Sequence, residues 1–146
     1  MTECVFCQIV SGKAPHRRLH DDHHAQAFFP LDPLAAGHTL VIPKKHAADL
    51  WTISSDDACH VMKTALQVAQ VIGDVVHPDG MTLVQNSRHA GGQDVFHFHM
   101  HLVPRWEGDA IGPLYPRSKS RPQVDEAELE MVHRAMLEKS SLNHLP

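Results

Sequence analysis

Polar and apolar residues alternate without a break along HFHMHL, residues 97–102. Successive side chains of a β-strand leave opposite faces of the sheet. The alternation therefore predicts a strand whose one face carries three imidazoles, those of His97, His99 and His101. Its other face carries three apolar side chains suited to a core.

A different period runs through residues 54–76, where apolar residues recur every three or four positions. This spacing is typical of an amphipathic helix. Ser54 or Ser55 can cap the first turn, and two aspartates follow directly, which suits the positive end of the helix dipole. The segment HPDG, residues 77–80, ends the pattern.

The other apolar segments are shorter. Those rich in β-branched or aromatic residues predict strands at residues 18–20, 25–29, 38–42 and 81–85. Those with helical spacing predict helices at residues 4–10 and 123–139. The order of strands, long helix, strands and final helix indicates an α+β fold with an antiparallel sheet.

Composition limits the class of protein. The chain has 146 residues, which suits one domain, with residues 111–146 as a C-terminal extension of a main part, 1–110. The net charge of −4 argues against binding nucleic acid polymers. No apolar run approaches the roughly 20 residues of a membrane span, and no leader peptide is evident, so we expect a cytoplasmic protein that does not bind membranes.

The imidazole row fits phosphoryl transfer. Imidazole can act as a nucleophile, a metal ligand or a proton donor near neutral pH. The loop AGGQ, residues 90–93, precedes the row and can point backbone N–H groups at an anion, and Asn86 ends the preceding strand. In this hypothesis His99 is the nucleophile, His101 donates to the phosphate oxygens, and His97 orients the site.

Three separate motifs resemble one known family. They are HFHMHLVP with the preceding Asn86 and Gly92-Gln93, the segment GHTLVIPKKH at residues 37–46, and CVFCQI at residues 4–9. In order and spacing they are similar to the histidine triad (HIT) family of nucleotide hydrolases and transferases, in particular its zinc-containing bacterial branch. The resemblance runs from about Cys4 to Trp106. It implies a homodimer with a five-stranded antiparallel sheet, one long helix and a C-terminal helix per subunit.

The resemblance also implies roles. His99 would attack the α-phosphorus of a purine nucleotide and form a nucleotidyl-histidine that water hydrolyses, with no cofactor needed for this chemistry. His101 would contact the phosphate, His38 would support the triad, and Asn86, Gly92 and Gln93 would line the phosphate and ribose region. The base pocket would be formed by five apolar residues that are equally good core residues: Val5, Phe6, Ile9, Phe28 and Leu31.

Two positions depart from the family pattern. Pro30 stands where many members carry an acidic residue facing the ribose, and whether Asp32 replaces that residue is open. Asp94 stands where some members have a small hydroxyl residue that can reach the phosphate or the leaving group. A carboxylate there would repel phosphate if it pointed inward, or it could act on a protonated leaving amine.

The CxxC at residues 4–7 indicates metal or redox chemistry in a reducing compartment, and redox chemistry is disfavoured because no βαβ pattern surrounds it. By the resemblance, Cys4, Cys7, His46 and His97 would make a Cys₂His₂ set, the ligand type that zinc prefers. Such a zinc would be structural. The alternative is two reduced cysteines on a short helix.

The leading functional hypothesis is a nucleotide hydrolase of phosphoramidase type. Within the same chemistry, the alternatives are a dinucleoside polyphosphate hydrolase or a nucleotidyltransferase. Outside it, the chain could be a metal-binding regulatory protein or a nucleotide-binding protein without turnover. The loop elements around Asn86 and Gly92 speak against a purely metal-binding row, because metal ligation does not need them.

Overall fold

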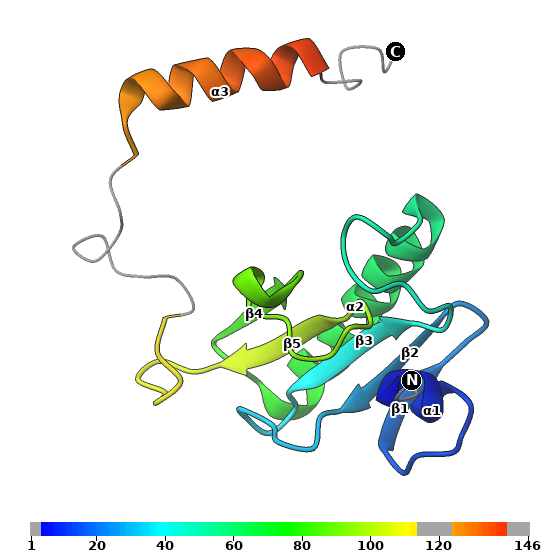
Figure 1. The fold of residues 1–146 in the computed structure, drawn as a ribbon. Coiled ribbons are helices and arrows are strands. Elements are labelled where there is room, and N and C mark those ends of the chain that lie inside the picture. Colours follow the sequence, from blue (N-terminus) through cyan, green and yellow to red (C-terminus); the bar gives the residue numbers. More distant parts are fainter. Residues whose placement is uncertain (1–3, 114–123, 140–146) are drawn as a thin grey trace. The chain divides into compact units, whose positions relative to one another are not determined.

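The structure is a computed structural model that describes residues 4–113 and 124–139. The chain divides into two compact units, Met1–Ala110 and Ile111–Pro146, which are described separately. Among the described residues, the first holds the sheet, two α-helices and the short 3-10 helix η1 (His89–Gly91), and the second holds the last helix (Figure 1). The division falls where the sequence predicted the C-terminal extension to begin. That both parts belong to one domain stays a prediction.

The first unit is built on a five-stranded sheet of order β1-β2-β3-β5-β4, in which every neighbouring pair is antiparallel. The predicted fold class, α+β with a five-stranded antiparallel sheet, is confirmed. The strands are β1 (Arg17–Asp21), β2 (Ala25–Phe29), β3 (Thr39–Pro43), β4 (Gly80–Gln85) and β5 (Met100–Arg105).

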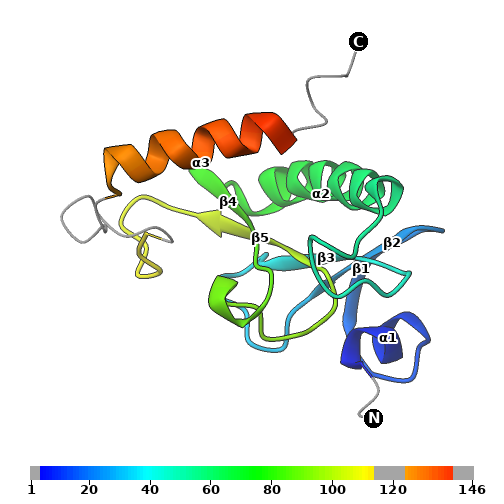
Figure 2. The ribbon, with the colours of Figure 1, turned by 45° about the horizontal axis from the view of Figure 1, so that its top comes forward.

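The long helix α2 (Ser55–Val76) covers one face of the sheet (Figure 2). It begins at Ser54, whose hydroxyl accepts a hydrogen bond from the backbone N–H of Asp57 at 3.1 Å, and it ends before His77, which takes a left-handed conformation. The core between helix and sheet consists of residues that alternate along the strands and recur along the helix. They are Ala27, Val41, Val61, Ala65, Val68, Ile72, Phe98 and Leu102.

The other face of the sheet is partly covered by the short helix α1 (Val5–Val10). Phe6 and Ile9 of this helix pack with Phe28, Leu40 and Ile42, the strand residues that alternate with the α2-facing ones. Phe6 also meets the rings of His97 and His99 edge-on, with ring centroids 5.9 and 5.3 Å away. The imidazoles therefore lie on the α1 side of the sheet.

The histidine stretch is only partly a strand, which corrects the sequence prediction. Pairing with β3 begins at Met100, so His97 and His99 precede the ladder and His101 is the one triad member within β5. The reason is a loop contact, because the backbone N–H of Phe98 donates to the carbonyl of Ala47 at 2.6 Å. The predicted side of the apolar residues is still correct, since Phe98 and Leu102 lie in the core beneath α2.

The second unit contributes α3 (Glu126–Lys139). Its predicted start, residue 123, lies outside the described residues. The carboxylate of Asp125 accepts from the backbone N–H of Glu128 at 3.1 Å and caps the first turn. Every side chain that the structure describes on this helix is exposed.

Candidate functional site

The ring of His99 is held by a hydrogen bond on one side only. Its Nδ1 lies 2.7 Å from the carbonyl oxygen of His97. A carbonyl can only accept, so Nδ1 carries the proton and a neutral ring then leaves Nε2 with a free lone pair. The side chain is 2% exposed, which fixes the ring in this orientation. His99 therefore presents an unprotonated Nε2.

His101 receives its orientation from His38 through a short chain of hydrogen bonds. The backbone N–H of Leu34 donates to Nδ1 of His38 at 3.0 Å, so a neutral His38 carries its proton on Nε2. That Nε2 lies 3.0 Å from Nδ1 of His101 and donates to it. His101 is left with its own proton on Nε2. The rings of His99 and His101 lie with centroids 4.9 Å apart, so a lone pair and an N–H donor stand side by side.

Burial keeps these rings neutral. It lowers the pKa of His38 below its usual 6.5, and it lowers the pKa of His101 to about 4, with the neighbouring His99 and His38 adding to the shift. A neutral ring is the form that the hydrogen-bond chain requires. The donor at His101 is therefore an uncharged imidazole N–H at neutral pH.

His97 bonds to the backbone through Nε2, whereas His99 does so through Nδ1. Its Nε2 donates to the carbonyl of Pro43 at 2.8 Å, which leaves the lone pair on Nδ1. That Nδ1 lies 3.5 Å from Sγ of Cys4 and 3.6 Å from Sγ of Cys7, and Nδ1 of His46 lies 3.3 Å from Sγ of Cys7. The four ligand atoms all lie within 4.8 Å of one another. The structure thus brings the predicted Cys₂His₂ set together.

The spacing and the protonation of this set fit a tetrahedral metal. Zinc with bonds of 2.0–2.3 Å in tetrahedral geometry places sulfur and nitrogen ligands about 3.6 Å apart. A metal-ligating histidine almost always donates its other ring nitrogen to a carbonyl or carboxylate, as His97 does to Pro43. His97 therefore fits the Cys₂His₂ set with its ring, and its backbone carbonyl holds the ring of His99.

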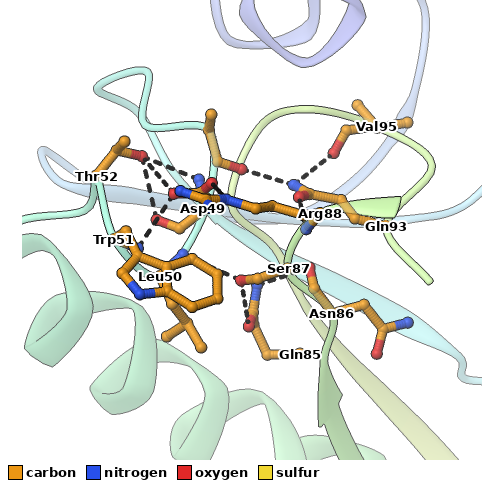
Figure 3. A network of polar contacts seen from close by, with 11 residues as sticks. Asp49, Leu50, Trp51, Thr52, Gln85, Asn86, Ser87, Arg88, Gln93 and Val95 are labelled. Atoms are coloured by element: carbon orange, nitrogen blue, oxygen red, sulfur yellow. Dashed lines mark hydrogen bonds and ion pairs between the residues drawn. The ribbon is translucent and has the colours of Figure 1, made fainter. Parts of the chain in front are cut away.

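The loop before the triad is built around a buried amide (Figure 3). Gln93 is 3% exposed, its Nε2 donates to the carbonyls of Ala48 and Val95 at 2.6 and 3.0 Å, and its Oε1 accepts from the backbone N–H of Arg88 at 2.6 Å. Sequence reasoning placed Gln93 against the phosphate or ribose. The structure shows that its side chain holds the loop together, and a place for Gln93 along the phosphate and ribose region stays a prediction.

The same loop contains a polar network that the sequence analysis did not identify. Arg88 has a positive φ of 62°, its Nε donates to Asp49 at 2.9 Å, and its guanidinium lies 4.3 Å from the centre of the exposed Trp51 ring. The hydrogen bond from Arg88 holds the pKa of Asp49 below its ordinary value. These residues are far apart in sequence and follow no motif, so no pattern in the chain pointed to them.

The remaining polar residues predicted for the site lie around this loop. Gly92 has a φ of 85°, and its carbonyl faces Nδ2 of Asn86 at 3.5 Å. A β-carbon at Gly92 would lie 3.5 Å from the same Nδ2. Asp94 lies close to the triad, with Oδ1 3.8 Å from Nε2 of His99.

Only three of the five residues predicted for a base pocket lie in one cluster. Phe6, Ile9 and Phe28 are buried in one cluster beneath α1. Val5 is 43% exposed, and Leu31, in the loop after β2, is 98% exposed. Asp32, the candidate replacement for the ribose-facing acid, lies exposed in that same loop.

Comparison with known proteins decides the family. The family model described as the HIT domain matches residues 11–108, about two thirds of the chain. The chain belongs to the HIT family. Membership supports a nucleotide-binding or hydrolase-type role, since the family consists generally of hydrolases and transferases.

Relatives and solved structures agree with this HIT assignment. An uncharacterised HIT-like protein of Mycoplasma genitalium is 41% identical over 129 residues, which cover 88% of this chain and 92% of the relative. A Zn-bound histidine triad family protein from Mycobacterium smegmatis is 34% identical, covers 94% of each chain and superposes with a TM-score of 0.72. A histidine triad nucleotide-binding protein from Candida albicans is 26% identical, covers 94% of this chain and 96% of its own, with a TM-score of 0.79.

Among the described residues of this HIT chain, no helix has the length and apolar character needed to cross a membrane.

The pH dependence of the stability of this HIT chain tests whether His101 is buried as a neutral ring. Because the pKa of His101 falls from 6.5 to about 4 on folding, the unfolded chain binds more protons at this ring between those pH values. The stability contribution of the neutral ring is present above pH 6.5 and is lost as the pH falls toward 4. We expect the free energy of unfolding, measured by denaturant titration, to fall less steeply over this range in His101→Asn than in the wild type.

The matched control is His133→Asn on the exposed helix α3, which should keep the wild-type pH dependence. Equal slopes for His101→Asn and the wild type would contradict the burial of a neutral ring at this position.

Proposed function

We propose that this HIT chain is a nucleotide hydrolase of phosphoramidase type, which cleaves the bond between the α-phosphorus of a nucleoside monophosphate and its leaving group. One observation carries the proposal. The lone pair on Nε2 of His99 stands beside a ring whose N–H is directed outward by the chain Leu34–His38–His101. A nucleophile next to a neutral donor is the arrangement that attack on a phosphate requires.

In the first step, Nε2 of His99 forms a bond to phosphorus and the bond from phosphorus to the leaving nitrogen breaks. The electron pair of that bond stays with the nitrogen, which takes up a proton from solvent and departs as an amine. The ring of His99 becomes positively charged, and the carbonyl of His97 stabilises this form through its 2.7 Å hydrogen bond to Nδ1. The N–H of His101 donates to a non-bridging phosphate oxygen as charge accumulates there.

In the second step, water attacks the phosphorus of the nucleotidyl-histidine. The bond from phosphorus to Nε2 breaks, its electron pair returns to His99, and the water proton passes to solvent. The products are a nucleoside monophosphate and the free enzyme. The carbonyl of His97 bonds Nδ1 of His99, the ring nitrogen opposite the reacting Nε2, so His97 acts on both steps by orienting the ring.

A dinucleoside polyphosphate hydrolase or nucleotidyltransferase would use the same two steps with another leaving group or acceptor, and it remains the second candidate. A purely metal-binding row is disfavoured, because the His/Cys/Asp/Glu cluster found within the described part of the chain takes only His97 from the triad. A binding protein without turnover would not need an unprotonated Nε2 on His99 beside the N–H donor of His101.

We extend the proposal to a purine base and to a homodimer, both of which rest on the family resemblance. The buried aromatic cluster of Phe6 and Phe28, with centroids 5.4 Å apart, supports an apolar base site beside the triad. The strand β4 forms an edge of the sheet within one subunit, which supports pairing with a second copy. A cytoplasmic location stays a prediction.

Removal of the nucleophile tests the proposal directly. We expect His99→Ala to lower kcat/KM for an adenosine 5′-phosphoramidate by at least about a thousandfold, because the covalent intermediate can no longer form. Release of the amine is measured with purified protein. His23→Ala changes an exposed histidine in the β1–β2 turn and should keep full activity.

Full activity in His99→Ala would refute the assignment of the nucleophile. Absence of hydrolysis by the wild-type protein with phosphoramidates and with dinucleoside polyphosphates would refute the enzymatic role as a whole.

We also propose that the Cys₂His₂ cluster holds a structural zinc ion. Cys4 and Cys7 flank the start of α1, and His46 and His97 lie on loops beside β3 and β5, so the ion would tie the N-terminal helix to the sheet. The ligand spacing and the hydrogen bond from His97 to Pro43 support it. The ion would also fix the carbonyl of His97, on which the orientation of His99 depends.

Metal content tests the zinc site without reference to activity. After washing with a weak chelator, we expect about one zinc per chain in the wild type and less than half an equivalent in Cys4→Ser and Cys7→Ser, with a lower Tm in both variants. Cys59→Ser is the control, because Cys59 is exposed on α2 and should retain the metal. Less than half an equivalent in the wild type would contradict the site.

A further inference from the structure

One acidic side chain stands at the reacting nitrogen. Oδ1 of Asp94 lies 3.8 Å from Nε2 of His99, and the Asp94 side chain is 83% exposed. Nε2 is the atom that attacks phosphorus in the proposed reaction, so any phosphate that binds there lies within the field of this carboxylate. A negative charge at this place is unexpected for an enzyme whose substrate is itself an anion.

The carboxylate is held in place by the loop. Its Oδ1 accepts from the backbone N–H of Val95 at 2.8 Å. The residues on both sides are anchored, because the buried amide of Gln93 donates to the carbonyls of Ala48 and Val95. Asp94 is therefore positioned by a hydrogen-bonded loop, and its side chain is accessible to a substrate group from solvent.

The nearby cations of this unit are engaged with other carboxylates. Arg88, in the same loop, donates to Asp49 at 2.9 Å, and Lys44, beyond the end of β3, pairs with Asp21 at 2.5 Å. The imidazoles around Nε2 do not offset the charge either, since burial lowers the pKa of His38 and His101. No lysine or arginine in the described part of the chain forms an ion pair with Asp94, so its carboxylate is available to a positively charged group of the substrate.

We propose that Asp94 is a specificity-determining residue that selects the leaving group by charge. It favours nucleoside 5′-phosphoramidates whose leaving amine carries a positive charge, and it disfavours polyphosphate leaving groups. The inference rests on the proposed function and narrows its substrate class. When the bond from phosphorus to nitrogen breaks, the electron pair leaves with the nitrogen and a proton from solvent joins it. The reacting nitrogen thus leaves as a neutral amine, and Asp94 stabilises the separate positive charge that the leaving group carries on a distal ammonium, whereas a departing phosphate would add a negative charge beside it.

The polyphosphate reaction illustrates the difference. A dinucleoside polyphosphate brings several negative charges into a site that already contains one fixed carboxylate. A phosphoramidate brings one negative charge at the attacked phosphorus and, with a basic side chain on the amine, one positive charge as well. Since Asp94 is exposed, the discrimination is moderate and sensitive to salt.

The test compares three substrates that share one adenosine 5′-phosphoryl group. The leaving groups are 2-aminoethylamine, which carries a distal ammonium, propylamine of similar length without that charge, and the triphosphate part of a dinucleoside tetraphosphate. We expect the wild type to prefer the charged amine over propylamine by about three- to tenfold in kcat/KM, with the ratio falling toward one as ionic strength rises from 0.02 to 0.5 M.

Three variants isolate the carboxylate. Asp94→Asn should bring the charged-to-neutral ratio to about one at low salt and raise kcat/KM for the tetraphosphate several-fold. Asp94→Glu should restore most of the preference for the charged amine. Asp74→Asn removes an exposed carboxylate from α2 and should leave all three rates and their salt dependence unchanged.

The two hypotheses fail in different ways. Hydrolysis of all three substrates with the same ratios in the wild type and Asp94→Asn overturns the selectivity and leaves the hydrolase intact. Absence of hydrolysis with every substrate overturns the proposed function and the selectivity with it. The salt dependence of the wild type is a measurement without a mutation, and a ratio that does not change with salt also overturns the role of Asp94.

Discussion

Each imidazole of the triad is fixed by a hydrogen bond at one ring nitrogen, and the chemistry depends on which nitrogen that is. His97 donates from Nε2 to Pro43, whereas His99 donates from Nδ1 to the backbone of His97. His101 accepts at Nδ1 from His38. Because the partners differ, three identical side chains in one row present different nitrogens: a lone pair on Nδ1 of His97, a lone pair on Nε2 of His99 and an N–H on Nε2 of His101.

These hydrogen bonds link the Cys₂His₂ set to the rest of the histidine triad. The backbone of His97 supplies the carbonyl that orients His99, and the ring of His97 lies among the ligand atoms of the Cys₂His₂ set. Packing reinforces the link, since Phe6 of α1 meets both rings edge-on while the cysteines Cys4 and Cys7 flank the first turn of that helix. A metal ion bound by these four residues would influence catalysis only by positioning the backbone of His97.

The sequence predicted the features that repeat or that form motifs. Alternation gave the face on which the imidazoles lie, and helical spacing gave α2. What it could not give depends on contacts between distant segments. The ladder begins only at Met100 because Phe98 bonds to a remote loop, and Gln93 supports the scaffold because two carbonyls converge on its amide. The inward direction of Asp94 was left open for the same reason, and the structure places it 3.8 Å from His99.

The central claim is that Nε2 of His99 forms a covalent bond to phosphorus, and trapping that bond tests it most directly. Wild-type protein mixed with excess adenosine 5′-phosphoramidate is quenched within the first turnovers under conditions that preserve bonds between phosphorus and nitrogen, and its peptides are analysed by mass spectrometry. We expect a nucleotidyl group on the peptide that contains residues 97–105, located at His99. A substrate that is hydrolysed without any adduct, or an adduct on another residue, would contradict it.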